Sequence, residues 1–161
     1  MSYSERHVLE TLIYLPMLAA LVLVFVPRPQ KTLIRWISIG SGLALLVMSL
    51  YAFVAFDYDG VSRFQLQRSY PWLDQLGIAF ALGIDGIAAP MVLLTGIVSL
   101  AGTIVAANIQ RDNKDYYILL FLLIAGVYGT FVSMDLFFFF FFYELAIVPM
   151  YLLIGIWGSS S

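Results

Sequence analysis

One acidic residue, Glu144, lies deep inside the most apolar part of the sequence, and its position favours proton chemistry. A phenylalanine run, 137–142, precedes it, and an apolar run, 145–148, follows it. Counted from Asp135, it lies about 13 Å along a helix, near the middle of a bilayer core about 30 Å thick. A charge at that depth costs about 2.5–3.5 kcal/mol, so we expect the carboxyl to face a partner or water. Because desolvation disfavours its ionised form and a nearby cation favours it, such a carboxyl can act as a proton switch.

Two further residues of the same segment support this interpretation. Pro149 has no N–H, so the carbonyl of Leu145 loses its helical partner and the helix is expected to bend there. Water could then reach both this carbonyl and the neighbouring acid. Tyr151 lies two turns beyond Glu144 on nearly the same helix face and could extend a polar path. The alternative is a neutral glutamate that only hydrogen-bonds an adjacent helix.

Other titratable residues lie nearer the ends of the apolar segments. Asp85 and Asp135 each precede such a segment, where an acid interacts favourably with the helix dipole. We therefore expect both to cap helices, with a supporting part in proton transfer as the alternative. His7 and Glu10 are three residues apart and could share a helix face, and we expect them at the level of the lipid headgroups.

The composition excludes several kinds of site. The chain has no cysteine and a single histidine, His7, so a disulfide, a thiolate metal site, an iron–sulfur cluster and a haem site have no ligands. No Gly-x-Gly-x-x-Gly or P-loop pattern occurs, which argues against a bound dinucleotide or ATP. The net charge of −2 and the lack of a basic patch argue against a nucleic-acid partner. We expect no metal and no cofactor in this chain.

The elements that position these residues are long apolar segments. Of the 161 residues, 62% are hydrophobic and 11% are charged, whereas an ordinary soluble domain is about one quarter charged. Runs of about twenty apolar residues are long enough to cross a bilayer as helices. The sequence therefore predicts an all-α integral membrane protein in the lipid bilayer, with residues 1–161 as one membrane domain. The five predicted spans are 8–26, 33–56, 84–107, 116–133 and 135–157.

The longest connection, 57–83, is expected to form a small β-hairpin at the membrane surface. Its start carries Asp59-Gly60, a turn signal, and an alternating run with Phe64 and Leu66 follows. This hairpin would lie between the second and third helices.

Small residues recur at helical spacing in the predicted spans, which favours close packing between helices. In the second span they are Ser38, Ser41, Gly42 and Ser49, in the third Thr95, Ser99, Gly102, Thr103 and Ala106, and in the fourth Ala125 and Gly129.

The basic residues favour one orientation in the membrane. Lys and Arg concentrate on the cytoplasmic side of membrane proteins. The two short connections carry five of them, and the opposite side carries three: Arg28, Lys31, Arg35, Arg111 and Lys114 against Arg6, Arg63 and Arg68. The bias predicts an external N-terminus, with the short connections inside.

Several motifs resemble one family of respiratory proteins. The blocks are Leu82-Gly83-Ile84-Asp85-Gly86-Ile87, Leu93-Leu94-Thr95, Asp135-Leu136, Tyr143-Glu144-Leu145-Ala146-Ile147-Val148-Pro149-Met150 and Gly155-Ile156-Trp157-Gly158. Together they are similar to the N-terminal third of chain M of proton-translocating NADH:quinone oxidoreductase, respiratory complex I. The block from Glu144 to Met150 and the Gly-Ile-Trp-Gly block are the most specific. One departure is Tyr143, where the family often has tryptophan.

The resemblance implies an antiporter-like membrane subunit with Glu144 as a central proton-channel residue. It also implies that NADH, FMN, iron–sulfur clusters and quinone are bound by other subunits, so that quinone is involved only indirectly. The implied partners are other membrane subunits of complex I, and the implied location is the bacterial inner (cytoplasmic) membrane. Family members have many more helices, including those with the partner lysines, so we expect this chain to be an N-terminal fragment of a larger subunit.

Two alternatives remain open at the level of the sequence. The same module occurs in multisubunit Na⁺/H⁺ antiporters and in membrane-bound hydrogenases, where a different reaction drives or uses proton movement. The chain could also be a membrane scaffold or remnant that conducts no protons.

Overall fold

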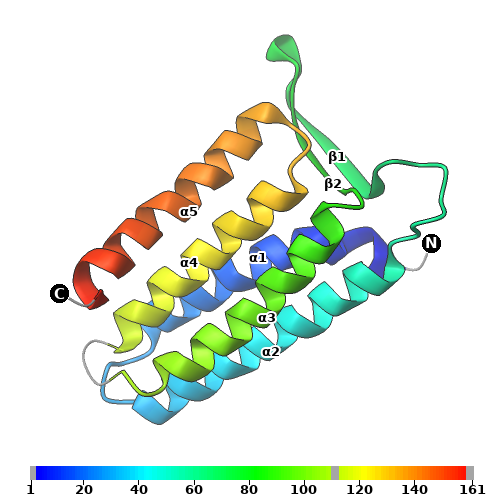
Figure 1. Ribbon diagram of the computed structural model, residues 1–161. Helices are drawn as coiled ribbons and strands as arrows, with labels where there is room; N and C mark the ends of the chain where they lie inside the picture. The colour runs from blue at the N-terminus through cyan, green and yellow to red at the C-terminus, as the bar shows by residue number, and fades with distance from the viewer. Residues whose placement is uncertain (1–2, 110–112, 159–161) are drawn as a thin grey trace.

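The chain forms a bundle of long helices with one β-hairpin at its end (Figure 1). The structure is a computed structural model and describes residues 3–109 and 113–158; Arg111, counted above among the basic residues, lies outside them. In this part of the chain the helices are α1 (Tyr3–Phe25), α2 (Lys31–Ala55), α3 (Ala88–Ala106), α4 (Asn113–Val132) and α5 (Leu136–Trp157). Each is long and apolar enough to cross a membrane, so the predicted five-helix membrane fold is confirmed.

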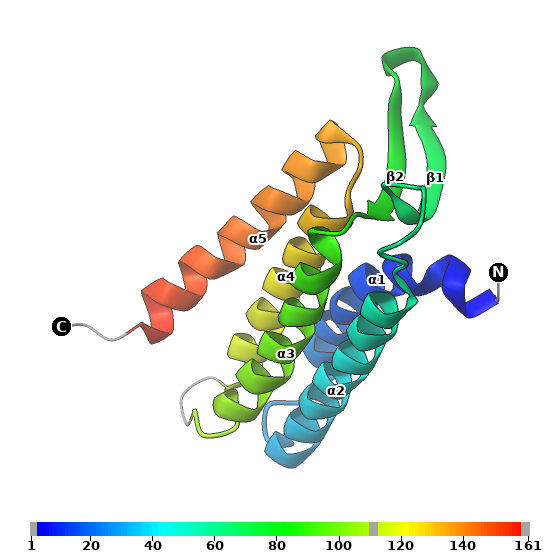
Figure 2. The ribbon, with the colours of Figure 1, turned by 45° about the vertical axis from the view of Figure 1, so that its right-hand side comes forward.

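Helix α4 lies at the centre of the bundle. It packs against α1, α3 and α5, while α2 packs against α1 and α3. In the apolar 18-residue stretch of α4, half of the residues are buried, whereas only 17% are buried in the corresponding stretch of α5. Three of the largest fully buried side chains, those of Tyr117, Phe121 and Tyr128, belong to α4. In both views α5 lies against α4 at the edge of the bundle (Figure 1, Figure 2).

The small residues bring α2 and α3 close together, as their spacing predicts. An added methyl group at Gly42 would lie 2.8 Å from Oγ1 of Thr103, and one at Gly96 would lie 2.7 Å from Oγ of Ser49. The hydroxyls buried at this interface also bind α4. Ser49 and Tyr128 share a hydrogen bond of 2.7 Å, and Tyr117 donates to the carbonyl of Thr103. Close backbone approach and these two hydrogen bonds thus hold the interior together, although the buried hydroxyl of Ser99 has no partner among the described residues.

The predicted hairpin is present, but its turn is elsewhere. Strand β1 (Gln65–Leu73) pairs antiparallel with β2 (Ile78–Ile84). The chain reverses through a short 3₁₀ turn, Asp74–Leu76, and Gly77, whose φ of 67° suits glycine. The Asp59-Gly60 pair, which indicated a turn, lies in the connection before β1 instead.

The predicted third span begins too early. Ile84 pairs with Gln65 in the hairpin, and α3 starts only at Ala88. The carboxyl of Asp85 accepts hydrogen bonds from the backbone N–H groups of Ile87 and Ala88. These donors belong to the start of α3. The apolar residues that were predicted as the start of one helix therefore belong to β2 before Asp85 and to α3 after it.

Candidate functional site

The candidate site lies on α5, and two glycines of α4 position that helix. A methyl group at Gly126 would lie 2.5 Å from the backbone nitrogen of Ala146, and one at Gly129 would overlap the ring of Phe142. The backbones of α4 and α5 can therefore approach closely at these two points. The buried residues of α5 are Phe138, Phe142 and Pro149, and they define the face that α5 turns toward α4.

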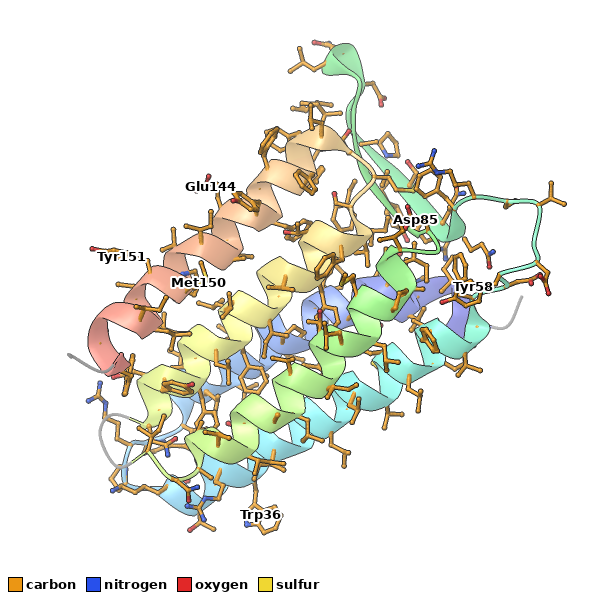
Figure 3. All side chains as sticks on the ribbon, viewed as in Figure 1. Trp36, Tyr58, Asp85, Glu144, Met150 and Tyr151 are labelled. Carbon is orange, nitrogen blue, oxygen red and sulfur yellow. The ribbon has the colours of Figure 1, made fainter. Side chains whose placement is uncertain are left out.

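Glu144 lies on a different face of α5. It is two residues from Phe142, and this spacing places it on nearly the opposite side of the helix. Its side chain is exposed in the isolated chain and projects away from the bundle (Figure 3). Among the described residues, none forms a hydrogen bond or an ion pair with it. The carboxyl is thus available to a group outside the part of the chain that the structure describes.

Glu144 also borders an apolar groove between α4 and α5. The groove has a volume of about 440 Å³. Its other lining residues are all apolar: Leu119 and Leu122 from α4, and Phe141, Leu145, Val148, Pro149 and Leu152 from α5. One carboxyl at the rim of an apolar groove is a poor site for a metal or a charged substrate. It is a suitable place for a group that gains and loses a single proton.

Pro149 and Tyr151 occupy different faces of α5. Pro149 is buried and lines the groove, and α5 is helical through it without interruption. Tyr151 is 75% exposed and projects from the same side of α5 as Glu144 (Figure 3). The structure therefore brings Tyr151 and Glu144 to one face of α5. Pro149 lies on another face and shares with Glu144 only the lining of the groove.

Asp135 and Asp85 lie away from Glu144, at helix starts. Asp135 accepts from the N–H groups of Phe137 and Phe138, the geometry of an N-terminal cap. Its second oxygen accepts from the N–H of Ala79 in β2, so it also ties α5 to the hairpin. Asp85 caps α3 and lies beside the hairpin, distant from Glu144 (Figure 3).

A polar cluster between α1 and the hairpin was not foreseen. Glu10 is largely buried and contacts His7 Nδ1 through one oxygen at 3.0 Å. Its other oxygen accepts from the hydroxyl of Tyr70 at 2.9 Å and lies 3.9 Å from Nε of Arg68. The spacing of His7 and Glu10 indicated their contact, but nothing in the sequence indicated partners about sixty residues away.

No described group of three or more His, Cys, Asp or Glu residues could hold a metal ion. The fold and the site together define a multispanning α-helical membrane protein with one carboxyl on the outward face of an otherwise apolar helix.

Comparison with known proteins specifies the family. No protein-family model matches the sequence. The chain is 36% identical over 151 residues to NAD(P)H-quinone oxidoreductase chain 4 2 of Microcystis aeruginosa. It is 38% identical to chain 4-2 of Synechocystis and 35% identical to the chloroplastic chain 4 of Physcomitrium patens. These matches cover 93% of this chain but only 27% to 30% of the relatives. The chain is homologous to the N-terminal part of a complex I membrane subunit, which confirms the resemblance found in the sequence.

Solved structures share the fold. A chain of the archaeal membrane-bound sulfane sulfur reductase matches with a TM-score of 0.76 and 25% identity, over 93% of this chain and 30% of its own length. A chain of respiratory complex I from Thermus thermophilus matches with a TM-score of 0.75 and 22% identity, over 92% of this chain and 29% of its own. At this level of identity the Thermus likeness concerns the fold alone.

Proposed function

We propose that this chain forms part of a membrane subunit of a proton-translocating NADH:quinone oxidoreductase and that Glu144 carries a proton in its transport path. The observation that carries the proposal is the position of Glu144, an acid without a described partner on the outward face of the least buried helix. The relatives named as quinone oxidoreductase subunits support the reaction class.

Leaving Glu144 exposed to lipid would cost free energy. An ionised carboxyl near the bilayer centre is expensive, and such residues face protein or a hydrated cavity. We therefore expect protein to cover the face of α5 that carries Glu144 and Tyr151. A cation supplied there would favour the ionised form, and its withdrawal would favour the protonated form. Proton uptake and release would then follow the movement of that cation.

The other residues have supporting parts in this proposal. Pro149 removes one backbone hydrogen bond beside the acid, which leaves the carbonyl of Leu145 free for water. Tyr151 extends the polar face of α5 by two turns. Asp135 ties the start of α5 to the hairpin, and Asp85 caps the start of α3, so they would hold the proton carrier in place without touching the proton.

The redox reaction belongs elsewhere in this proposal. NADH, FMN, iron–sulfur clusters and quinone would be bound by other subunits, in keeping with a sequence that has no cysteine and no Gly-x-Gly-x-x-Gly motif. The partners would be the other membrane subunits of complex I and the surrounding lipid. We place the complex in a bacterial inner membrane, although one relative is chloroplastic.

A second candidate keeps the module and changes the reaction that drives it. The likeness to a chain of the sulfane sulfur reductase favours this alternative, because its TM-score of 0.76 is close to the 0.75 of the complex I chain. Glu144 would keep its part as a proton carrier. Replacing NADH by another electron donor in the same membranes would separate the two candidates.

Substitution of Glu144 in the assembled complex tests the proposal. Glu144→Gln keeps the shape and hydrogen-bonding capacity of the side chain but removes the titrating proton. It should lower NADH-driven proton pumping roughly tenfold or more and slow electron transfer, while the complex still assembles. Glu144→Asp shortens the side chain by one methylene and should keep part of the activity.

The opposite order of effects would assign Glu144 to packing. If the acid only bridges helices, Glu144→Gln should pump normally and Glu144→Ala should reduce the amount of assembled complex. Pumping and assembly are measured in the same membranes, so that a loss of protein is not mistaken for a loss of proton transfer. Normal pumping in Glu144→Gln would refute the proposed function.

A further inference from the structure

A second cavity lies at the end of the bundle opposite the hairpin, away from Glu144. It is formed where α1 turns into α2 and where α3 is followed by α4, and its volume is about 750 Å³. Among the described residues, four cationic side chains line it, Arg28, Lys31, Arg35 and Lys114, together with one carboxylate, that of Asp115. The proposed function leaves this cavity without a role.

Most of the positive charge in the cavity has no acidic partner among the described residues. Arg28 pairs with Asp115 at 3.0 Å. Arg35 donates to the carbonyl of Ala107, and Lys114 donates to the carbonyls of Val24 and Val26. These carbonyls end α3 and α1 but carry no formal charge. Lys31 forms no ion pair with any described residue, so three of the four cations lack a counter-charge there.

The start of α2 adds to this positive potential. The helix begins at Lys31, its N-cap residue Gln30 makes no side-chain cap, and its first turn holds no acid. The positive end of the helix dipole therefore lies at the cavity, because Lys31, Thr32 and Ile34 of the first turn line it. The N-terminal end of a helix repels a cation such as Lys31, whereas it attracts an anion, so a bound anion would interact favourably with both the helix and the lysine.

Aromatic residues indicate that the cavity lies at the level of the lipid headgroups. Trp36, one turn from the start of α2, is 67% exposed and points outward (Figure 3). At the same end, the rings of Tyr116 and Trp157 contact each other at 5.4 Å. Trp and Tyr gather at the interface between membrane and water. Phe25 at the end of α1 and Leu33 in the first turn of α2 are exposed by 78% and 45%, and they are close in sequence to Arg28 and Thr32, which line the cavity.

We propose that this cavity binds the phosphate group of an anionic phospholipid. The cations and the start of α2 would hold the phosphate, and the exposed Phe25, Leu33 and Trp36 would contact the acyl chains. Free phosphate would use the same cations, but it gains nothing from the apolar flank. By the distribution of Lys and Arg, this end faces the cytoplasm, where the leaflet is rich in anionic lipid.

Quenching of tryptophan by brominated lipids tests the proposal. The full chain is reconstituted into phosphatidylcholine vesicles that contain a small fraction of phosphatidylglycerol with brominated acyl chains. The contribution of Trp36 is the difference between the wild type and Trp36→Phe. We expect stronger quenching of Trp36 by brominated phosphatidylglycerol than by brominated phosphatidylcholine at the same mole fraction.

Charge variants locate the binding. The side chain of Lys31 forms no hydrogen bond or ion pair with a described residue, so Lys31→Gln should fold normally and weaken the preference for phosphatidylglycerol about fivefold. Lys31→Glu should abolish the preference. Arg63→Gln removes one exposed charge at the hairpin end and should leave it unchanged.

Three results would overturn the proposal. Equal quenching of Trp36 by the two brominated lipids would mean that no anionic lipid is selected. An unchanged preference in both Lys31 variants would place the lipid elsewhere. Competition by inorganic phosphate, beyond that of sodium chloride at equal ionic strength, would assign the cavity to a soluble anion. Neither folding nor pumping is needed as a readout, so the result is independent of the role of Glu144.

Discussion

Glu10 and Glu144 are both carboxyls on apolar helices, and their surroundings differ in a way that separates anchoring from proton transfer. Both oxygens of Glu10 are engaged by His7, Tyr70 and Arg68. Glu144 has no described partner. A carboxyl held by several fixed donors ties the elements that carry those donors together. Only a carboxyl whose partner can come and go is suited to carry a proton.

The contact of Tyr70 with Glu10 should hold the hairpin on α1. Tyr70→Phe removes one hydrogen bond to a carboxyl group, so we expect the contact between the hairpin and α1 to weaken and the amides of the hairpin to exchange faster. Tyr58→Phe is the matched control, since its hydroxyl binds no described residue. Amide hydrogen exchange across β1 and β2 measures the effect, and equal exchange in the two variants would contradict it.

The same contact has a pH dependence of known sign. The hydrogen bond to Glu10 is the largest of the causes that raise the pKa of Tyr70 above its ordinary value. The protonated phenol is therefore favoured in the folded chain. Its stabilising contribution is complete below the pKa of an unfolded tyrosine, about 10, and is lost as the pH rises through the higher folded value.

At the scale of single residues, local partners could be predicted and distant ones could not. Asp85 and Asp135 bind N–H groups two and three residues ahead, so their position in the sequence suffices to expect helix caps. The depth of Glu144 follows from counting along the chain. Whether Glu144 faces α4 or points away from it depends on where Gly126 and Gly129 let α4 approach α5. The residues next to Glu144 in the sequence do not reveal this.

At the scale of elements, α5 depends on one partner helix. It packs closely against α4 and makes no comparable contact with another described helix. The two glycines of α4 make that contact possible. Because only 17% of the apolar window of α5 is buried, loss of this interface would release the helix that carries Glu144.

Gly126→Ala tests this dependence. The added methyl group would lie 2.5 Å from the backbone of Ala146, and backbone cannot move aside as a side chain can, so overpacking should cost about 1–3 kcal/mol. Gly155→Ala, on α5 itself, is the control because its methyl group would meet nothing within 4 Å. Cross-linking of cysteines placed at Leu122 and Leu145 reports the interface. The yield should fall in Gly126→Ala only; equal yields would show that the approach is not tight.

The boundaries of an element could be predicted where the length of an apolar run sets them. They could not be predicted where hydrogen bonding between strands sets them. The spans of α2, α4 and α5 lie within a few residues of the prediction. The start of α3 was placed too early because the apolar residues before Asp85 belong to β2. A strand and a helix are equally apolar here, and only the partner strand distinguishes them. The hairpin turn was misplaced for a related reason: Gly77 follows a 3₁₀ turn that lacks the Asp-Gly signal.

At the scale of the whole molecule, the two ends of the bundle differ in chemistry. One end carries the hairpin, the Glu10 cluster and both helix caps of α3 and α5. The other end carries the short connections and the basic cavity. The alternation of the helices puts the N-terminal end of α1 beside the hairpin (Figure 1). By the distribution of Lys and Arg, we expect the hairpin end outside and the basic end inside.

Labelling of single cysteines tests this orientation. The chain has no cysteine of its own, so Ser62→Cys and Asn108→Cys provide unique thiols at exposed positions near opposite ends. A membrane-impermeant maleimide added to intact cells should label Ser62→Cys alone. Asn108→Cys should react only after the membrane is opened. Labelling of both from outside would contradict the count of membrane spans.

The central claim is that Glu144 changes its protonation state during turnover, and redox-induced infrared difference spectroscopy of the assembled complex tests it most directly. A protonated carboxyl absorbs apart from the amide bands, so proton uptake or release by one glutamate appears as a difference band. We predict such a band in the wild type, shifted in heavy water, and its loss in Glu144→Gln, with the band retained in Glu10→Gln. A spectrum of Glu144→Gln identical to that of the wild type in this region would show that Glu144 keeps its proton throughout, and would contradict the account.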